Sequence, residues 1–147
     1  MSEVSNSDDI ISLDALRERI AELEGEEASL QEDVESAESE LDYEPDNETL
    51  GESLTTAREA LAAWTAEHGT EKEMLVAFES DVSGYGDTAI RDSYFQTYAR
   101  ELAEDVCGDE MRAASWPLSC IDWEQAATEL QSDYSCVEFD GVDYWVR

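Results

Sequence analysis

The stretch LDALRERIAELEGEEASLQEDVESAESEL, residues 13–41, contains apolar residues that recur every three or four positions. This spacing places them on one stripe of an α-helix and is typical of a coiled-coil seam. We therefore predict a long helix over residues 13–41. Its seam residues are Leu13, Leu16, Ile20, Leu23, Leu30 and Val34, followed by Ala37 and Leu41.

A second helix is predicted after a short turn. The segment Tyr43-Glu44-Pro45-Asp46-Asn47 indicates a helix end and a turn, and apolar residues then recur from Leu50 to Trp64. His68-Gly69 predicts the end of this second helix, because glycine supplies a left-handed cap. Two helices with a short connection predict an antiparallel hairpin. Because the first seam is longer than the second can cover, we expect a second copy to cover the rest in a homodimer.

Glu27 stands where the seam requires an apolar residue, and Gly25 lies just before it. One interpretation is a kinked or frayed point on a solvated helix. The other is a carboxylate that is needed at a set position. The sequence leaves both interpretations open.

The remainder of the chain has the pattern of a small α+β module. Thr70-x-x-Glu73 is a capping box for a short helix, and the stretch from Ile90 to Val106 predicts an amphipathic helix. Asp122-x-x-Gln125 caps a further helix. Asp140-Gly141 lies between alternating apolar residues, which is a strong β-hairpin signal.

These patterns predict a mostly α protein with a small β component, of the α+β class. The first domain, residues 1–69, is predicted to be an acidic, coiled-coil-like helical hairpin. The second domain, residues 70–147, is predicted to be a small helical module that ends in a β-hairpin.

The charge of the chain is extreme, with 39 acidic and 8 basic residues and a formal net charge of −31. Small soluble domains typically carry a net charge of about 2–8 in magnitude. Residues 1–68 hold 21 acids and 3 bases, and residues 69–147 hold 18 acids and 5 bases. The composition argues against a disordered acidic tail, because 41% of the residues are hydrophobic and 9% are aromatic. Such a chain is repelled by nucleic acid and by anionic membranes, so we expect a basic, DNA-binding protein as its partner.

Motifs for catalysis and for bound groups are missing from the sequence. There is one histidine, His68, and no Walker loop or Gly-x-Ser-x-Gly motif. The three cysteines, Cys107, Cys120 and Cys136, contain no Cys-x-x-Cys pair, so we expect free and mostly buried thiols. We therefore predict a non-enzymatic protein with no metal and no cofactor. With no long apolar run and no basic leader, we expect it in the cytoplasm.

The first helix carries carboxylates at a density close to that of DNA phosphates. Its 29 residues would span about 43 Å and hold eleven acids, and one strand of B-DNA places about 13 phosphates over that length. Coiled-coil surfaces usually mix Glu with Lys, yet Arg17 and Arg19 are the only bases here. We therefore interpret its carboxylates as phosphate mimics, with Glu18, Glu22, Asp33, Glu35 and Glu40 as candidate contacts.

The second half of the chain resembles a known family. The run IDWEQAATEL, residues 121–130, and the hairpin VEFDGVDYWVR, residues 137–147, are similar to the C-terminal part of ArdA-type antirestriction proteins, which are DNA mimics encoded by phages and plasmids. The resemblance covers about residues 75–147, and Trp116–Leu130 matches the antirestriction motif of the family. It implies an acidic dimer that occupies the DNA groove of type I restriction–modification enzymes, with Asp122, Glu124 and Glu129 in the motif region. The N-terminal domains of that family are replaced here by the heptad-patterned hairpin.

Two functions remain open. The first is a DNA-mimicking inhibitor of a nucleic-acid-binding defence complex, either a restriction–modification enzyme or a CRISPR effector, acting in the cytoplasm of a host cell if a phage encodes it. The second is a coiled-coil structural or adaptor protein from an acid-rich or salt-adapted source, which the single lysine, Lys72, beside seven arginines also fits.

Overall fold

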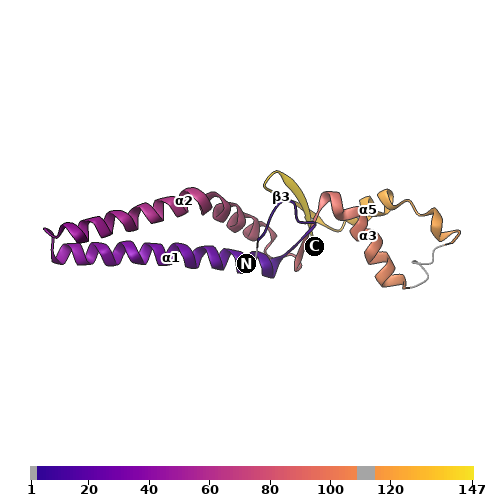
Figure 1. Cartoon of the computed structure of the whole chain (residues 1–147). Helices are drawn as coiled ribbons and strands as arrows, with labels where there is room; N and C mark the ends of the chain where they lie inside the picture. Colours follow the sequence, from indigo (N-terminus) through magenta and orange to yellow (C-terminus); the bar gives the residue numbers. More distant parts are fainter. Residues whose placement is uncertain (1–2, 109–114) are drawn as a thin grey trace. The chain divides into compact units, whose positions relative to one another are not determined.

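The computed structural model describes residues 3–108 and 115–147 (Figure 1). The fold is mostly helical with a small four-stranded antiparallel sheet, which confirms the predicted α+β class. Two compact units are present. One comprises Arg17–Ala77, and the other comprises Met1–Leu16 together with Phe78–Arg147.

Two long helices form the predicted hairpin, α1 over Leu13–Tyr43 and α2 over Glu48–Val82. The predicted turn between them is confirmed. The Asn47 Oδ1 atom accepts hydrogen bonds from the backbone N–H groups of Thr49 (3.1 Å) and Leu50 (3.3 Å). Asn47 therefore caps α2, because the first N–H groups of a helix have no partner within it.

The predicted helix end at His68-Gly69 is wrong, because α2 continues without a break to Val82. Thr70-x-x-Glu73 therefore lies inside the helix and is not a capping box. A glycine inside a helix costs about 1 kcal/mol, which the burial of later residues such as Leu75 and Phe78 offsets. The length of α2 also removes the excess of α1 seam on which the expectation of a homodimer rested.

The N-terminal residues supply a strand that the sequence did not predict. Strand β1, Ile10–Ser12, pairs antiparallel with β2, Thr88–Arg91, in a sheet of order β1-β2-β4-β3. Ile90, expected at the start of a helix, lies in β2 and is fully buried. The N-terminal segment thus belongs to the compact unit that also holds the C-terminus.

The predicted C-terminal β-hairpin is confirmed. It consists of β3, Ser135–Phe139, and β4, Val142–Val146. Asp140 (φ 48°) and Gly141 (φ 77°) both have positive φ, as a two-residue type I′ turn requires. Phe139 and Tyr144 are buried, and their rings lie 4.7 and 5.9 Å from that of Phe78. The hairpin therefore packs on a helix, as the marginal stability of an isolated hairpin requires.

The same unit contains the helices α3, Asp92–Cys107, and α5, Trp123–Gln131, with a short 3-10 turn, η1, over Leu118–Cys120. Helices α3 and α5 contact each other. Phe95, Ala99 and Ala127 are buried there in one apolar cluster with Ile90.

The three cysteines are free, as expected. All three are exposed, however, so the expectation of mostly buried thiols is wrong. Cys107 lies in the last turn of α3 and Cys120 in η1, whereas Cys136 lies on strand β3. Each of these places lies near the surface of a small unit, where apolar burial is limited.

Candidate acidic binding surface

The hairpin has two halves that use their carboxylates differently. We define the proximal half as residues 17–31 and 60–77, and the distal half as residues 32–59, which includes the turn. Side chains of α1 and α2 contact each other in both halves. Arg19 reaches Glu71 in the proximal half, and Arg58 reaches Glu38 in the distal half, each at 3.0 Å.

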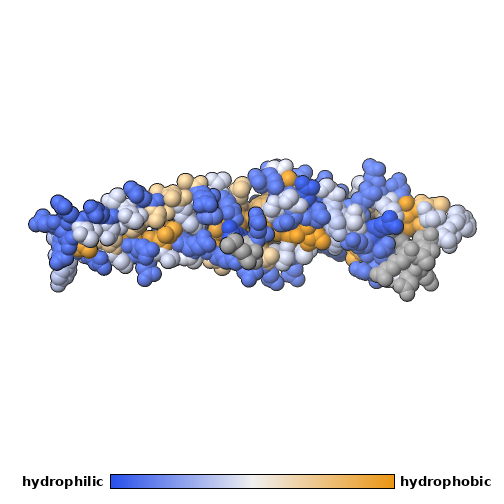
Figure 2. Space-filling model, in the orientation of Figure 1, coloured by the Kyte–Doolittle hydropathy of each residue, from blue (hydrophilic) through white to orange (hydrophobic). Residues whose placement is uncertain are grey.

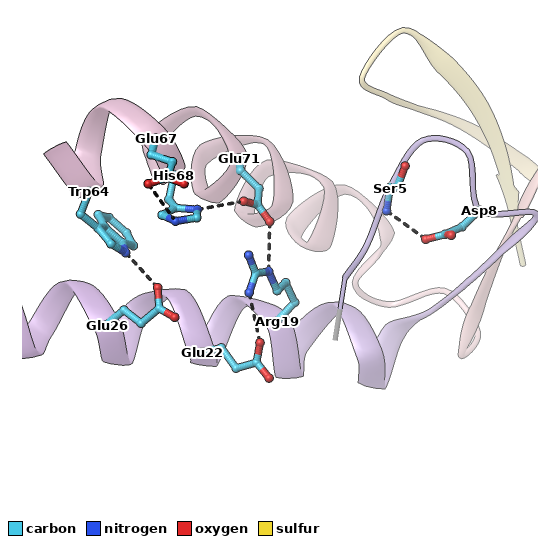
Figure 3. A network of polar contacts seen from close by, with 9 residues as sticks. All are labelled: Ser5, Asp8, Arg19, Glu22, Glu26, Trp64, Glu67, His68 and Glu71. Atoms are coloured by element: carbon cyan, nitrogen blue, oxygen red, sulfur yellow. Dashed lines mark hydrogen bonds and ion pairs between the residues drawn. The ribbon is translucent and has the colours of Figure 1, made fainter. Parts of the chain in front are cut away.

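In the proximal half, Arg19 lies between carboxylates of both helices (Figure 3). Its Nε atom donates to Glu71 at 3.0 Å, and its Nη1 atom donates to Glu22 at 3.2 Å. The Arg19 residue is only 9% exposed, which is rare for a charged group unless it is paired. His68 lies on the other side of Glu71, with Nδ1 at 3.4 Å from the carboxylate. Arg19 therefore joins α1 to α2 through an ion pair that is largely shielded from water.

Two further contacts join the helices in this half. Lys72 pairs with Glu27, and the Trp64 indole N–H donates to Glu26 at 2.9 Å. Glu27 is half-buried and lies in a continuous helix, so it is a carboxylate held at a set position rather than a frayed point. The only lysine of the chain thus pairs with the one carboxylate that interrupts the seam.

These contacts shift the proton affinities of the groups that form them. The hydrogen bond to Glu71 raises the pKa of Arg19 above its ordinary value, and burial only partly opposes this effect. For Glu71, burial acts to raise the pKa, but hydrogen bonds from Arg19 and His68 outweigh it, so the pKa lies below its ordinary value. Glu71 is therefore held in its charged form by its neighbours.

The distal half contains almost no positive charge. No lysine or arginine occurs from Ile20 to Ala57, and the distal half holds eleven acids against one base, Arg58. Ten of these acids are exposed: Glu32, Asp33, Glu35, Glu40, Asp42, Glu44, Asp46, Glu48, Glu52 and Glu59. Within the part of the chain that the structure describes, Glu38 is the distal acid that forms an ion pair. The other distal carboxylates are therefore available to a cation from outside.

The charge density of the distal half matches that of duplex DNA. Residues 32–43 of α1 rise about 18 Å, and α2 returns beside them, so the net charge of eleven acids and one base amounts to one negative charge per about 1.8 Å. B-DNA carries one per about 1.7 Å of helix axis. In the proximal half, eight acids and three bases over about 22 Å leave one net charge per about 4.5 Å.

A shallow groove runs between the two helices of the distal half. Its carboxylates are Asp33 and Glu40 from α1 and Glu52 from α2, and its other lining residues are small: Ser36, Ala37, Thr49, Ser53, Thr56, Ala57 and Ala60. Small side chains let a partner approach the helix backbones closely. The face drawn in Figure 2 is mostly hydrophilic over the hairpin, with isolated apolar areas.

The structure separates the predicted phosphate mimics into different environments. Asp33 and Glu40 line one groove, and Glu35 is exposed on the same helix. Glu18 is exposed in the proximal half, whereas Glu22 is half-buried and paired with Arg19. Glu22 thus neutralises a cation of its own chain.

The acids predicted on the C-terminal module lie in the other compact unit. Asp122 caps α5 and accepts from the Gln125 N–H at 3.2 Å, and Glu129 accepts from the Gln125 side chain at 3.2 Å. Glu124 is exposed in the first turn. Two of these three acids, Asp122 and Glu129, therefore already have local partners.

The predicted oligomer seam is largely covered within the chain. Leu13, Leu16 and Leu23 are buried, and Ile20, Leu30 and Val34 are half-buried.

The sequence analysis missed the acids of the turn and of α2, including Glu52. These acids could have been predicted from the sequence, because no lysine or arginine occurs from Ile20 to Ala57.

No family model, curated protein or solved structure matches this chain. In the described residues, no group of three or more His, Cys, Asp or Glu side chains is arranged to hold a metal ion. A search of the same residues for a helix long and apolar enough to cross a membrane found none.

Proposed function

We propose that this protein is a DNA mimic that inhibits a nucleic-acid-binding defence complex by occupying its DNA groove. The complex is a restriction–modification enzyme or a CRISPR effector in the cytoplasm of a host cell. The distal carboxylates pair with the lysines and arginines that otherwise hold phosphates, and no covalent chemistry takes place.

The observation that carries this proposal is the distal half of the hairpin. It has a net charge density close to that of the duplex, and three of its exposed acids, Asp33, Glu40 and Glu52, line one groove. A folded protein bears the self-repulsion of such a surface at a cost in stability. A basic partner offsets this cost when it binds.

The resemblance of residues 75–147 to ArdA-type proteins also supports the proposal, because nearly all of these residues lie outside the distal half and beyond the end of α2 at Val82. It further suggests a dimer as the acting form. Sedimentation equilibrium at about 0.15 M salt, where surface charges are screened beyond about 8 Å, measures this directly. A strict monomer at tens of micromolar would remove the dimer and leave the groove-occupation proposal standing.

The experiment is a competition assay. A type I restriction enzyme and a CRISPR effector are each given labelled DNA with and without the protein, and displacement of the DNA is measured. A distal block variant carries Asp33→Asn, Glu35→Gln, Glu40→Gln and Glu52→Gln. Its matched control removes the same charge from four exposed acids elsewhere, through Glu73→Gln, Asp87→Asn, Asp133→Asn and Glu138→Gln.

We expect the distal block to weaken inhibition by at least tenfold and the control by less than threefold, because exposed pairs contribute about 0.2–1 kcal/mol each and four of them lie in one patch. Inhibition should also fall steeply with salt, as DNA binding does. Equal effects of the two variants, or inhibition that persists with DNA bound beforehand in excess, would contradict groove occupation.

The alternative is a structural or adaptor protein from a salt-adapted source. The acids of the C-terminal part of the chain favour it, because residues 69–147 also carry 18 acids against 5 bases. It predicts no binding to basic proteins, and folding that requires salt at about molar levels. The competition assay and a salt titration of folding therefore separate the two functions.

A further inference from the structure

The end of the hairpin contains a small apolar hollow beside an exposed aromatic ring. We name it the tip hollow; it is lined by Ser39, Glu40, Tyr43, Glu44 and Leu50. Most of its lining surface is apolar, in a part of the chain that is otherwise dominated by carboxylates. Tyr43 is the last residue of α1 and is 92% exposed. An aromatic side chain left in water at this place contributes little to the fold.

The carboxylates of Glu40 and Glu44 line the hollow together with the Tyr43 ring. The Glu44 N–H donates to the Glu40 carbonyl at 3.2 Å, which extends the last turn of α1. The Asn47 side-chain amide donates to the Glu44 carboxylate at 3.2 Å, and Asn47 is itself fixed as the cap of α2. Glu44 is thus oriented by the turn, whereas Glu40 is exposed.

We propose that the tip hollow binds an arginine side chain presented by a basic protein, with the guanidinium stacked on Tyr43 and paired with Glu40 and Glu44. This proposal rests on the proposed function and names the contact at which a DNA-binding partner is recognised. The charge of the surroundings favours a cationic occupant and repels an acidic one, because no base lies between Ile20 and Ala57.

Arginine fits this hollow better than lysine for a physical reason. A guanidinium is planar and weakly hydrated, stacks on aromatic faces and forms two parallel hydrogen bonds with a carboxylate. An ammonium ion is compact and strongly hydrated, so it loses more on leaving water for an apolar floor made by Leu50 and Tyr43. Cation–π contacts with an exposed ring are modest, and they correspond to about a two- to fivefold change in affinity.

The test uses the full chain and two probes, a nona-arginine peptide and a nona-lysine peptide, with dissociation constants measured by calorimetry. The three variants are Tyr43→Ala, Tyr43→Phe, which keeps the ring, and Tyr85→Ala, which removes an exposed tyrosine of the other unit. Because both peptides also bind other acids, the quantity measured is the preference, meaning the ratio of the two dissociation constants.

We expect Tyr43→Ala to lower the preference for arginine by about two- to fivefold, and Tyr43→Phe and Tyr85→Ala to leave it unchanged. Amide NMR shifts caused by the arginine peptide should include residues 39–50. The proposal is overturned if Tyr43→Ala keeps the full preference, or if those shifts lie elsewhere. Since Tyr43 is exposed, circular dichroism should show the same fold in every variant.

The same variants separate this proposal from the proposed function. Loss of the preference in Tyr43→Ala, with no loss of DNA displacement in the distal block variant, would keep the tip hollow as an arginine site and remove groove occupation. Unchanged preference in Tyr43→Ala, with displacement lost in the distal block variant, would keep groove occupation and remove the arginine site.

Discussion

The proximal and distal halves of the hairpin are built from the same heptad pattern but use it for different purposes. In the proximal half, Leu23 and Leu75 are fully or almost fully buried, and Arg19 and Lys72 neutralise the carboxylates beside them. In the distal half, Leu54 is buried but the seam residues Leu41 and Leu50 are only half-buried, and eleven acids stand against one base, Arg58. The comparison indicates that the proximal half neutralises much of its charge within the hairpin, whereas the distal half presents its charge to solvent.

The largest expected effect is the loss of stability when a buried leucine side chain is shortened. Leu23→Ala should lower the free energy of unfolding by about 3 kcal/mol, because it leaves a cavity at a fully buried site. Leu50→Ala, at a half-buried site in the distal half, should lower it by about 1 kcal/mol. Urea denaturation followed by circular dichroism measures both. Equal losses would show that the two halves contribute alike to stability.

Hydrogen exchange sharpens the same comparison without any substitution. Amides of the proximal half should exchange only through global unfolding, whereas those of residues 32–59 should open at a lower free energy, because eleven carboxylates repel one another there against a single base. Uniform protection along α1 and α2 would contradict the division into halves.

The second prediction concerns the two cross-helix arginines. Arg19→Ala should cost about 2 kcal/mol, since the Arg19 side chain is 10% exposed and its loss leaves Glu71 and Glu22 without a counter-ion. Arg58→Ala should cost at most about 0.5 kcal/mol, because the Arg58 and Glu38 side chains are 60% and 46% exposed. The double variant Arg19→Met with Glu71→Met should recover much of the loss if the cost arises from unpaired charge.

The sequence predicted more of the fold than of the surface. The spacing of apolar residues was sufficient to predict α1, and turn-forming residues were sufficient to predict the turn at Asn47 and the β-hairpin at Asp140-Gly141. Each of these features depends on residues close together in the sequence. The strands β1 and β2 were missed because each has only three or four residues, too few to show an alternation of apolar and polar side chains. Their pairing also joins residues about 80 positions apart in the sequence. The end predicted at Gly69 failed because packing of Leu75 and Phe78 outweighed the low helix propensity of glycine.

For the candidate site, the sequence predicted acidity but not its arrangement. Counting carboxylates could not separate Glu22, which pairs with Arg19, from Asp33, which faces solvent, since the difference depends on where α2 places its own side chains. It also could not show that Glu27 pairs with Lys72, 45 residues away. The exposed Tyr43 ring and the tip hollow require the turn geometry, which is a property of the folded hairpin.

A third prediction is that salt stabilises the protein through its distal half. Raising salt from about 20 mM to about 300 mM should raise the Tm by several degrees, because screening reduces repulsion among carboxylates that have no counter-ion. The distal block variant should gain less from salt than its matched control. A Tm that falls over this range, or equal gains in both variants, would show that distal repulsion does not limit stability.

The smallest effect concerns pH and arises in the proximal half. The pKa of Glu71 lies below the ordinary value of 4.5 in the folded state, because hydrogen bonds from Arg19 and His68 outweigh the effect of its burial. Its contribution to stability is therefore fully present above about pH 4.5 and is lost as the pH falls through its lower folded-state pKa.

The measurement for Glu71 is the difference in unfolding free energy between the wild type and Glu71→Gln from pH 7 to pH 3. We expect this difference to be about 1 kcal/mol above pH 4.5 and to decline toward zero at lower pH. The value is modest because the Glu71 side chain is 30% exposed. Glu40→Gln, at an exposed distal site, serves as the control. Its difference should be near zero or of opposite sign at pH 7, since it removes a repelling charge. A difference for Glu71→Gln that stays constant down to pH 3 would mean that the Arg19 hydrogen bond does not depend on the charge of Glu71, and that the two halves differ in packing alone.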